Sequence, residues 1–135
     1  MRRKSSGFTL IEILTTIVIL SIVAGLAVPT FTNAIEQSRR GEACTTLNVI
    51  HMGQKIYQLN NGTFWNPGNN PAVATVNTNL NVDISMQYYT ITRIQGNATT
   101  YAATVQRVGN AAVTCIFSYD TGTGVLTKAP ATFCP

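Results

Sequence analysis

The feature that most constrains this sequence is a single carboxylate inside a long apolar segment. The segment Phe8–Val28 reads FTLIEILTTIVILSIVAGLAV, and Glu12 is its fifth residue. A charged side chain within a membrane-spanning helix costs roughly 2.5–3.5 kcal/mol on insertion scales. Because no Lys or Arg lies within the segment, we expect Glu12 to find its partner at a chain terminus or on another molecule.

The same segment is long enough to cross a bilayer. Its 21 residues form a helix of about 31 Å, which matches the hydrocarbon core of a membrane. Arg2, Arg3 and Lys4 precede it, and cytoplasmic flanks favour positive charge. We therefore expect the N-terminus in the cytoplasm and everything after Pro29 outside.

Cleavage between Gly7 and Phe8 would supply the partner that Glu12 lacks. Phe8 would then carry a free ammonium group about one helical turn from the carboxylate. The carboxylate would meet this amine in its own chain or in the next subunit of a stack.

The junction GFTLIE at residues 7–12, followed by an apolar helix with Pro29 near its end, resembles the class III signal of type IV pilins and of the pseudopilins of type II secretion systems. The resemblance is specific over residues 4–29 and looser through about residue 65. It implies that a prepilin peptidase cuts after Gly7 and methylates Phe8. It also implies that Phe8, Glu12, Gly25 and Pro29 take part in assembly.

The expected fold is α+β and similar to that of type IV pilins, with a long kinked N-terminal helix packed on a small antiparallel sheet. Residues 1–7 form a leader peptide, residues 8–29 a membrane and filament-core helix, and residues 30–60 the amphipathic half of the same helix. Residues 61–135 form a loop and sheet region, and residues 30–135 make up the globular domain. Gly25 and Pro29 weaken helix propensity, so we expect a kink between them.

The second half of the helix has one apolar face. Its members recur at steps of three and four residues, as one face of a helix requires: Ala43, Leu47, Ile50, Gln54 and Tyr57. Ile56 and Leu59 are expected to widen this face, and Gly53 to allow a strand to approach closely. Because an apolar face is stable when it is buried, we expect this side of the helix to pack against the sheet.

The remainder of the chain alternates between loops and strands. Residues 60–85 are rich in Asn and contain Pro67 and Pro71, which indicates a loop with little regular structure. Alternating patterns then predict strands over Met86–Ile94, Thr100–Val108 and Ala112–Tyr119, and a short fourth strand over Val125–Lys128. The short turns between them favour an antiparallel meander.

Three cysteines are present. Cys115 and Cys134 lie in the part expected to be exported, where disulfides persist, and we expect them to be bridged. The pair also resembles the disulfide-bounded C-terminal region of pilins. Cys44 is then a free, buried thiol, although a bridge from Cys44 to one of the other two is the alternative, because connectivity cannot be read from sequence.

Charge and motifs exclude several functions. The formal charge is +4, but without Arg2, Arg3 and Lys4 the chain keeps six basic and five acidic side chains, a charge of +1. No basic stripe for nucleic acid is evident, and the pair Arg39–Arg40 indicates a solvated helix face. His51 is the only histidine, so neither a metal site nor a catalytic set is predicted. We expect no enzyme activity and no cofactor.

The sequence therefore predicts a structural subunit of a type IV pilus-like filament, anchored in the inner membrane by one span after leader cleavage and then polymerised through its helix. Lipid contacts are exchanged for helix contacts at little cost, and the pairing of Glu12 with Phe8 sets the register. Expected partners are the prepilin peptidase and methyltransferase, copies of the chain and other pilins, the inner-membrane assembly machinery, and lipid before assembly. A nucleic-acid partner stays open.

Two other functions stay open. The first is a pseudopilin of a type II secretion system, which forms a periplasmic piston instead of an extracellular pilus. The second is an exported soluble binding domain with an ordinary signal peptide. Glu12 argues against the second, because a carboxylate is out of place in the apolar region of such a signal.

Overall fold

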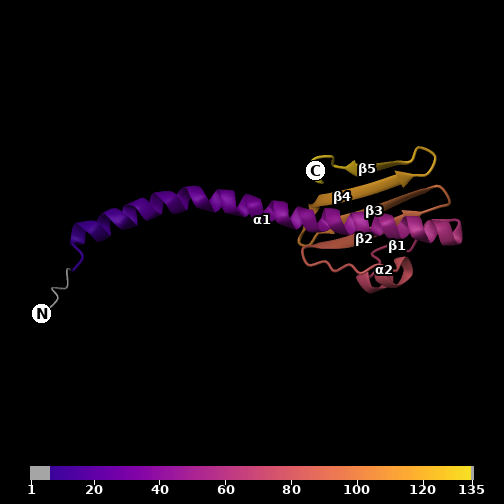
Figure 1. The fold of residues 1–135 in the computed structure, drawn as a ribbon, viewed down its shortest axis with the longest axis horizontal. Coiled ribbons are helices and arrows are strands. Elements are labelled where there is room, and N and C mark those ends of the chain that lie inside the picture. The colour runs from indigo at the N-terminus through magenta and orange to yellow at the C-terminus, as the bar shows by residue number, and fades with distance from the viewer. Residues whose placement is uncertain (1–6, 135) are drawn as a thin grey trace, which may run out of the picture. The chain divides into compact units, whose positions relative to one another are not determined.

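The computed structural model of the chain describes residues 7–134, so residues 1–6 of the expected leader lie outside the described part. The chain divides into two compact units, Met1–Gln37 and Ser38–Pro135. One helix, α1 (Leu10–Asn61), begins in the first unit and ends in the second, where a five-stranded sheet and a second helix follow it (Figure 1). The expected α+β fold, with a long N-terminal helix and an antiparallel sheet, is confirmed.

Helix α1 is continuous through Gly25 and Pro29. Near these residues, the hydroxyl of Thr30 donates to the carbonyl oxygen of Leu26 at 3.0 Å. Residues 30–60 therefore extend the N-terminal helix without a break in helical structure.

The sheet is an antiparallel meander in chain order. Its strands are β1 (Gly68–Asn69), β2 (Tyr89–Gly96), β3 (Thr100–Arg107), β4 (Asn110–Asp120) and β5 (Val125–Ala129). The last four correspond to the four predicted strands, with β2 beginning three residues later than expected. The three central strands, β2, β3 and β4, bury alternate side chains over much of their length. The helix-facing side therefore holds one apolar layer that includes Ile94, Ala103 and Phe117, paired in register across these strands.

The predicted face of α1 forms the other half of the core. Ala43, Leu47, Ile50 and Gln54 are fully buried, and Tyr57 is half-buried against the core. The predicted widening was wrong, because Ile56 and Leu59 are 57% and 84% exposed. At about 100° per residue, these two positions turn away from the buried row and lie on the outer side of the helix.

The Asn-rich segment is more regular than expected. It contains β1 and a second helix, α2 (Val73–Leu80), so the prediction of a loop with little regular structure was wrong. Val76 and Leu80 are buried one turn apart, and together with Val73 they form a short apolar stripe that packs on the core. The many Asn residues hid this spacing.

Gly53 and Gln54 hold this segment against α1. A Cβ at Gly53 would lie 2.9 Å from atoms of Leu80 and Val82, so the close neighbour is the end of α2 and not a strand as expected. The buried amide of Gln54 donates to the carbonyl of Trp65 at 3.0 Å and accepts from its N–H at 2.9 Å. Both polar groups of this core side chain are therefore satisfied.

Candidate functional site

Among the described residues, the side chains of the N-terminal part of α1 form an exposed apolar surface. Every side chain from Phe8 to Val28 is exposed, and Phe8 itself is 82% exposed. By length and composition, this stretch is a helix that can cross a membrane. Such a surface is stable only in lipid or against other apolar helices.

Glu12 has a partner within its own chain. Its carboxylate oxygen Oε2 accepts from the backbone N–H of Thr9 at 3.0 Å and from the Thr9 hydroxyl at 2.9 Å. In return, the N–H of Glu12 donates to the Thr9 hydroxyl at 3.3 Å. This reciprocal pattern is a capping box at the start of α1.

The capping box gives the Glu12 carboxylate hydrogen-bond partners that were not expected from the sequence, but it does not neutralise the charge, so a charged partner for Glu12 stays a prediction. The spacing Thr9-x-x-Glu12 was visible in the sequence and was missed. The predicted roles of Gly7, Phe8, Glu12, Gly25 and Pro29 in processing and assembly remain predictions.

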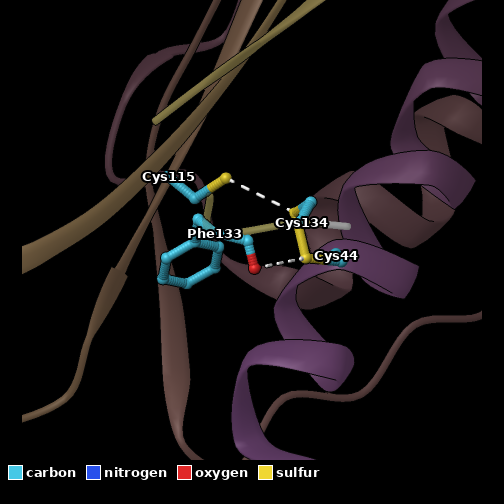
Figure 2. The surroundings of a disulfide bond; sticks show 4 residues. All are labelled: Cys44, Cys115, Phe133 and Cys134. Atoms are coloured by element: carbon cyan, nitrogen blue, oxygen red, sulfur yellow. Dashed lines mark hydrogen bonds between the residues drawn. A yellow bond between two sulfur atoms is a disulfide. The ribbon is translucent and has the colours of Figure 1, made fainter. Parts of the chain in front are cut away.

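The disulfide joins α1 to the C-terminal segment. Cys44 and Cys134 are bonded, with their Cα atoms 5.7 Å apart, and Cys115 is a free buried thiol (Figure 2). The predicted Cys115–Cys134 bridge was therefore wrong. Cys44 lies on the side of α1 that meets the returning C-terminus, at a separation within the usual range for a disulfide. Sequence spacing carried no information about this contact.

Cys115 lies beside the bridge without joining it. Its sulfur is 3.7 Å from that of Cys134, as Figure 2 shows. Burial raises the pKa of the Cys115 thiol to about 11, against smaller opposing effects from the Lys128 charge and a backbone hydrogen bond. The thiol is therefore protonated and a poor nucleophile at neutral pH.

Four basic side chains of the second unit stack on aromatic rings. Their charged groups lie 4.6–5.7 Å from the ring centres, in the pairs Arg39 on Tyr88, Arg40 on Phe133, Lys55 on Tyr119, and Lys128 on Phe117. Each such contact is worth about 0.5–1 kcal/mol at an exposed site. A contact with a ring holds the cation in place and does not neutralise its charge.

The second unit carries all six basic side chains that remain when Arg2, Arg3 and Lys4 are left out. Between Ser38 and Pro135 it has six basic and three acidic side chains, a formal charge of +3 with His51 neutral. The acids are Glu42, Asp83 and Asp120. An excess of this sign favours an anionic partner.

His51 belongs to an aromatic cluster between α1 and the sheet. Its Nδ1 is hydrogen-bonded to the hydroxyl of Tyr101, and its ring contacts the rings of Tyr101 and Tyr119. Burial, together with the nearby charge of Lys55, lowers the pKa of His51 below its usual range. The contacts of this histidine are therefore those of a structural residue with a hydrogen-bond partner.

Two family matches together cover most of the chain. Residues 2–28 match the family described as prokaryotic N-terminal methylation motif, which implies processing by a prepilin peptidase. Residues 29–116 match the family described as type IV minor pilin ComP, DNA uptake sequence receptor. The first match covers the apolar segment, and the second covers all of α1 in the globular unit and most of the sheet.

Individual relatives match over shorter stretches. The chain is 33% identical to the type II secretion system core protein G of Aeromonas hydrophila over 63 residues, which is 47% of this chain and 44% of that protein. It is 40% identical to core protein G of Pseudomonas aeruginosa over 60 residues, 44% of this chain and 42% of that protein. It is 35% identical to the type IV major pilin protein PilA of Myxococcus xanthus over 54 residues, 40% of this chain and 24% of that protein.

The aligned part is thus less than half of each of these three relatives. The match over residues 29–116, by contrast, spans more than half of this chain. The protein therefore belongs to the family of the type IV minor pilin ComP, and it is a structural subunit of a pilus and not an enzyme.

Proposed function

We propose that this pilin is cut between Gly7 and Phe8, methylated at Phe8, and carried into a pilus where its globular unit binds DNA for uptake. Before assembly, residues 8–29 hold it in the inner membrane with the N-terminus in the cytoplasm. The observation that carries the assembly part is the fully exposed apolar surface of α1 with one carboxylate near its start.

Assembly exchanges one apolar environment for another. Contacts with lipid tails around residues 13–26 are replaced by contacts with neighbouring helices, and the exchange costs little because the two surroundings are equally apolar. Register must then come from a polar contact. The Phe8 ammonium of a neighbouring subunit, buried among helices, requires a carboxylate, and Glu12 supplies it.

DNA is the proposed ligand of the globular unit. The description of the family to which the chain belongs names a receptor for DNA uptake sequences. The side chains of the globular unit have a formal net charge of +3, which favours an anionic ligand such as DNA. Cations held on aromatic faces supply charge for a phosphate backbone. A minor subunit needs only a few copies in the filament to present such a site.

The test compares a strain that lacks this chain with the same strain complemented by the wild type or by Glu12→Ala. The measurements are the mature N-terminus by mass spectrometry, the presence of the chain in sheared pili, and uptake of labelled duplex DNA. We expect uptake to fall in the deletion strain and to return only with the wild type. Unchanged uptake in the deletion strain would contradict the DNA function and leave the pilus function standing.

A pseudopilin function is the second candidate, and it is supported by the similarity to core protein G of type II secretion systems. Such a subunit would act in a periplasmic piston. The same deletion strain discriminates between the two. Loss of protein secretion into the medium, with pili and DNA uptake intact, would favour the pseudopilin.

A further inference from the structure

The face of the sheet that is turned away from α1 carries a hollow at one end. Its volume is about 530 Å³, which is within the usual range for sites of small ligands. Its floor is a row across four strands, in which Gln95 pairs with Ala102, Ala102 with Ser118, and Ser118 with Thr127. These positions alternate with residues that pack toward α1, so their side chains lie on the opposite face.

Two turns form the rim of the hollow, and hydrogen bonds fix both of them. In the β2–β3 turn, Oδ1 of Asn97 accepts from the N–H of Thr99 at 2.8 Å. In the β4–β5 turn, Oδ1 of Asp120 accepts from the N–H of Gly122 at 2.7 Å. The turns are also joined to each other, because the N–H of Thr121 donates to the carbonyl oxygen of Thr99 at 2.9 Å. The rim is therefore ordered before a ligand arrives, which lowers the entropic cost of binding.

Polar side chains of the hollow are free to bind a ligand. Within the part of the chain that the structure describes, the side chains of Gln95, Ser118 and Thr127 make no hydrogen bond. An amide and two hydroxyls can each donate and accept, and Asp120 uses Oδ1 in its turn and has a second carboxylate oxygen that accepts. The hollow thus offers several donors and acceptors that a ligand can use without breaking a bond within the protein.

The lining also excludes several classes of ligand. Asp120 is the one charged side chain among the described residues that line the hollow, so phosphate and other anions are disfavoured. An apolar ligand would leave the amide and the hydroxyls without partners, which costs free energy. Tyr101 and Tyr119 line the hollow too, but their rings contact His51 on the α1 side of the sheet. The ligand must therefore be neutral and rich in hydrogen-bonding groups.

We propose that this hollow binds a neutral carbohydrate of one or two sugar rings. Each sugar hydroxyl both donates and accepts, so it can pair with the free amide and hydroxyls of the floor and donate to Asp120. The small side chain of Ala102 leaves room for a ring above the centre of the row. The inference concerns a second ligand of the globular unit, and it does not rest on the proposed DNA function.

The experiment follows amide chemical shifts of the full mature chain by NMR, in dodecylphosphocholine micelles, because this detergent has no sugar headgroup. The probes are glucose, galactose, mannose, N-acetylglucosamine, lactose and maltose. Gln95→Ala, Ser118→Ala and Thr127→Ala each remove one polar group without breaking a hydrogen bond within the protein, and Ala102→Leu fills the floor. Thr90→Ala is the matched control, because it removes the same hydroxyl as Thr127→Ala from the same face of the sheet, outside the hollow. Circular dichroism melting verifies that each variant is folded.

At least one of these sugars should shift the amides of the lining residues in a saturable manner, with a dissociation constant of about 1 mM. Each loss of one polar group should weaken binding about two- to tenfold, and Ala102→Leu should abolish it. Thr90→Ala should leave it unchanged, and the anionic sugar glucuronate should bind more weakly than the best neutral sugar, because Asp120 repels it.

Three results would overturn the proposal. The first is that none of the neutral sugars shifts these amides at about 50 mM, well above the expected dissociation constant. The second is that Ala102→Leu binds like the wild type, or that Thr90→Ala weakens binding as much as Thr127→Ala does. The third is that glucuronate binds as tightly as the best neutral sugar. None of these results bears on the proposed pilus and DNA functions.

Discussion

The hydroxyl and the backbone N–H of Thr9 donate to the same carboxylate oxygen of Glu12, at 2.9 and 3.0 Å. One oxygen therefore caps the helix in the single chain, and a carboxylate has a second oxygen to offer a neighbour. Glu12 thus combines two tasks that substitutions can separate. Its hydrogen bonds start the helix, and its charge is proposed to hold the Phe8 ammonium of the next subunit.

The first prediction uses Glu12→Gln beside Glu12→Ala. Gln keeps a carbonyl oxygen for the two bonds from Thr9, whereas Ala loses both and keeps only the bond from its backbone N–H to the Thr9 hydroxyl. Both remove the charge, and a buried ammonium left without its partner costs roughly 3–5 kcal/mol. We expect both variants to insert into the membrane and to be cleaved, and both to be strongly depleted from sheared pili when compared with the membrane fraction.

Thr9→Ala is the complementary control, because it removes the cap and keeps the charge. It should lower helix stability slightly and leave incorporation close to that of the wild type. Wild-type incorporation of Glu12→Gln would mean that the charge does not set the register.

The second prediction concerns the mature terminus. The chain recovered from pili should begin at Phe8 and carry one N-methyl group, as mass spectrometry of the N-terminal peptide will reveal. Gly7→Arg should block cleavage, because a bulky charged side chain occupies the space that glycine leaves beside the scissile bond. The uncut chain should then stay in the membrane fraction. Assembled material that retains residues 1–7 would contradict the proposed processing.

The spacing of apolar residues along the sequence predicted the structural features that depend only on residues close together in the chain. The row Ala43, Leu47, Ile50 and Gln54 is buried as expected, and the last four strands follow the alternating pattern. These regularities are local, because a helix or a strand turns its side chains by a constant angle. The same reasoning failed at Leu59, because this residue was assigned to the buried face although its position around the helix is on the opposite side.

Contacts between distant parts of the chain were beyond such reasoning. Cys44 and Cys134 are 90 positions apart, and only the folded chain brings them together. The stacked cations have the same origin, because Arg40, Lys55 and Lys128 are scattered in the sequence and only the folded chain places each of them over an aromatic ring. A charge of +1 for the mature chain likewise concealed the +3 of its globular unit.

The third prediction concerns the disulfide. Peptide mapping without reduction should recover Cys44 linked to Cys134, with Cys115 alkylated only after unfolding. In a Cys115→Ala background, where no substitute bridge can form with that residue, adding Cys44→Ser should lower the free energy of unfolding by about 4–5 kcal/mol, the chain-entropy value for a loop of this length. Cys115→Ala alone should cost about 1–2 kcal/mol through its small cavity. If Cys115→Ala alone and Cys115→Ala combined with Cys44→Ser lower the free energy of unfolding equally, the bridge does not stabilise the fold.

The fourth prediction concerns His51 and pH. Burial and the charge of Lys55 lower the pKa of His51 in the folded chain below the ordinary 6.5, so near pH 6 the unfolded chain binds more protons than the folded one. The free energy of unfolding should therefore fall as the pH drops through and below 6.5.

His51→Gln, which can still hydrogen-bond to Tyr101, should flatten this dependence of the free energy of unfolding on pH, whatever its effect on absolute stability. Lys55→Gln should reduce the slope in part, because only the charge contribution is lost. Urea unfolding at pH 5.0–7.5, followed by circular dichroism, measures the three slopes. Parallel slopes for the wild type and His51→Gln would mean that this histidine does not couple folding to protonation.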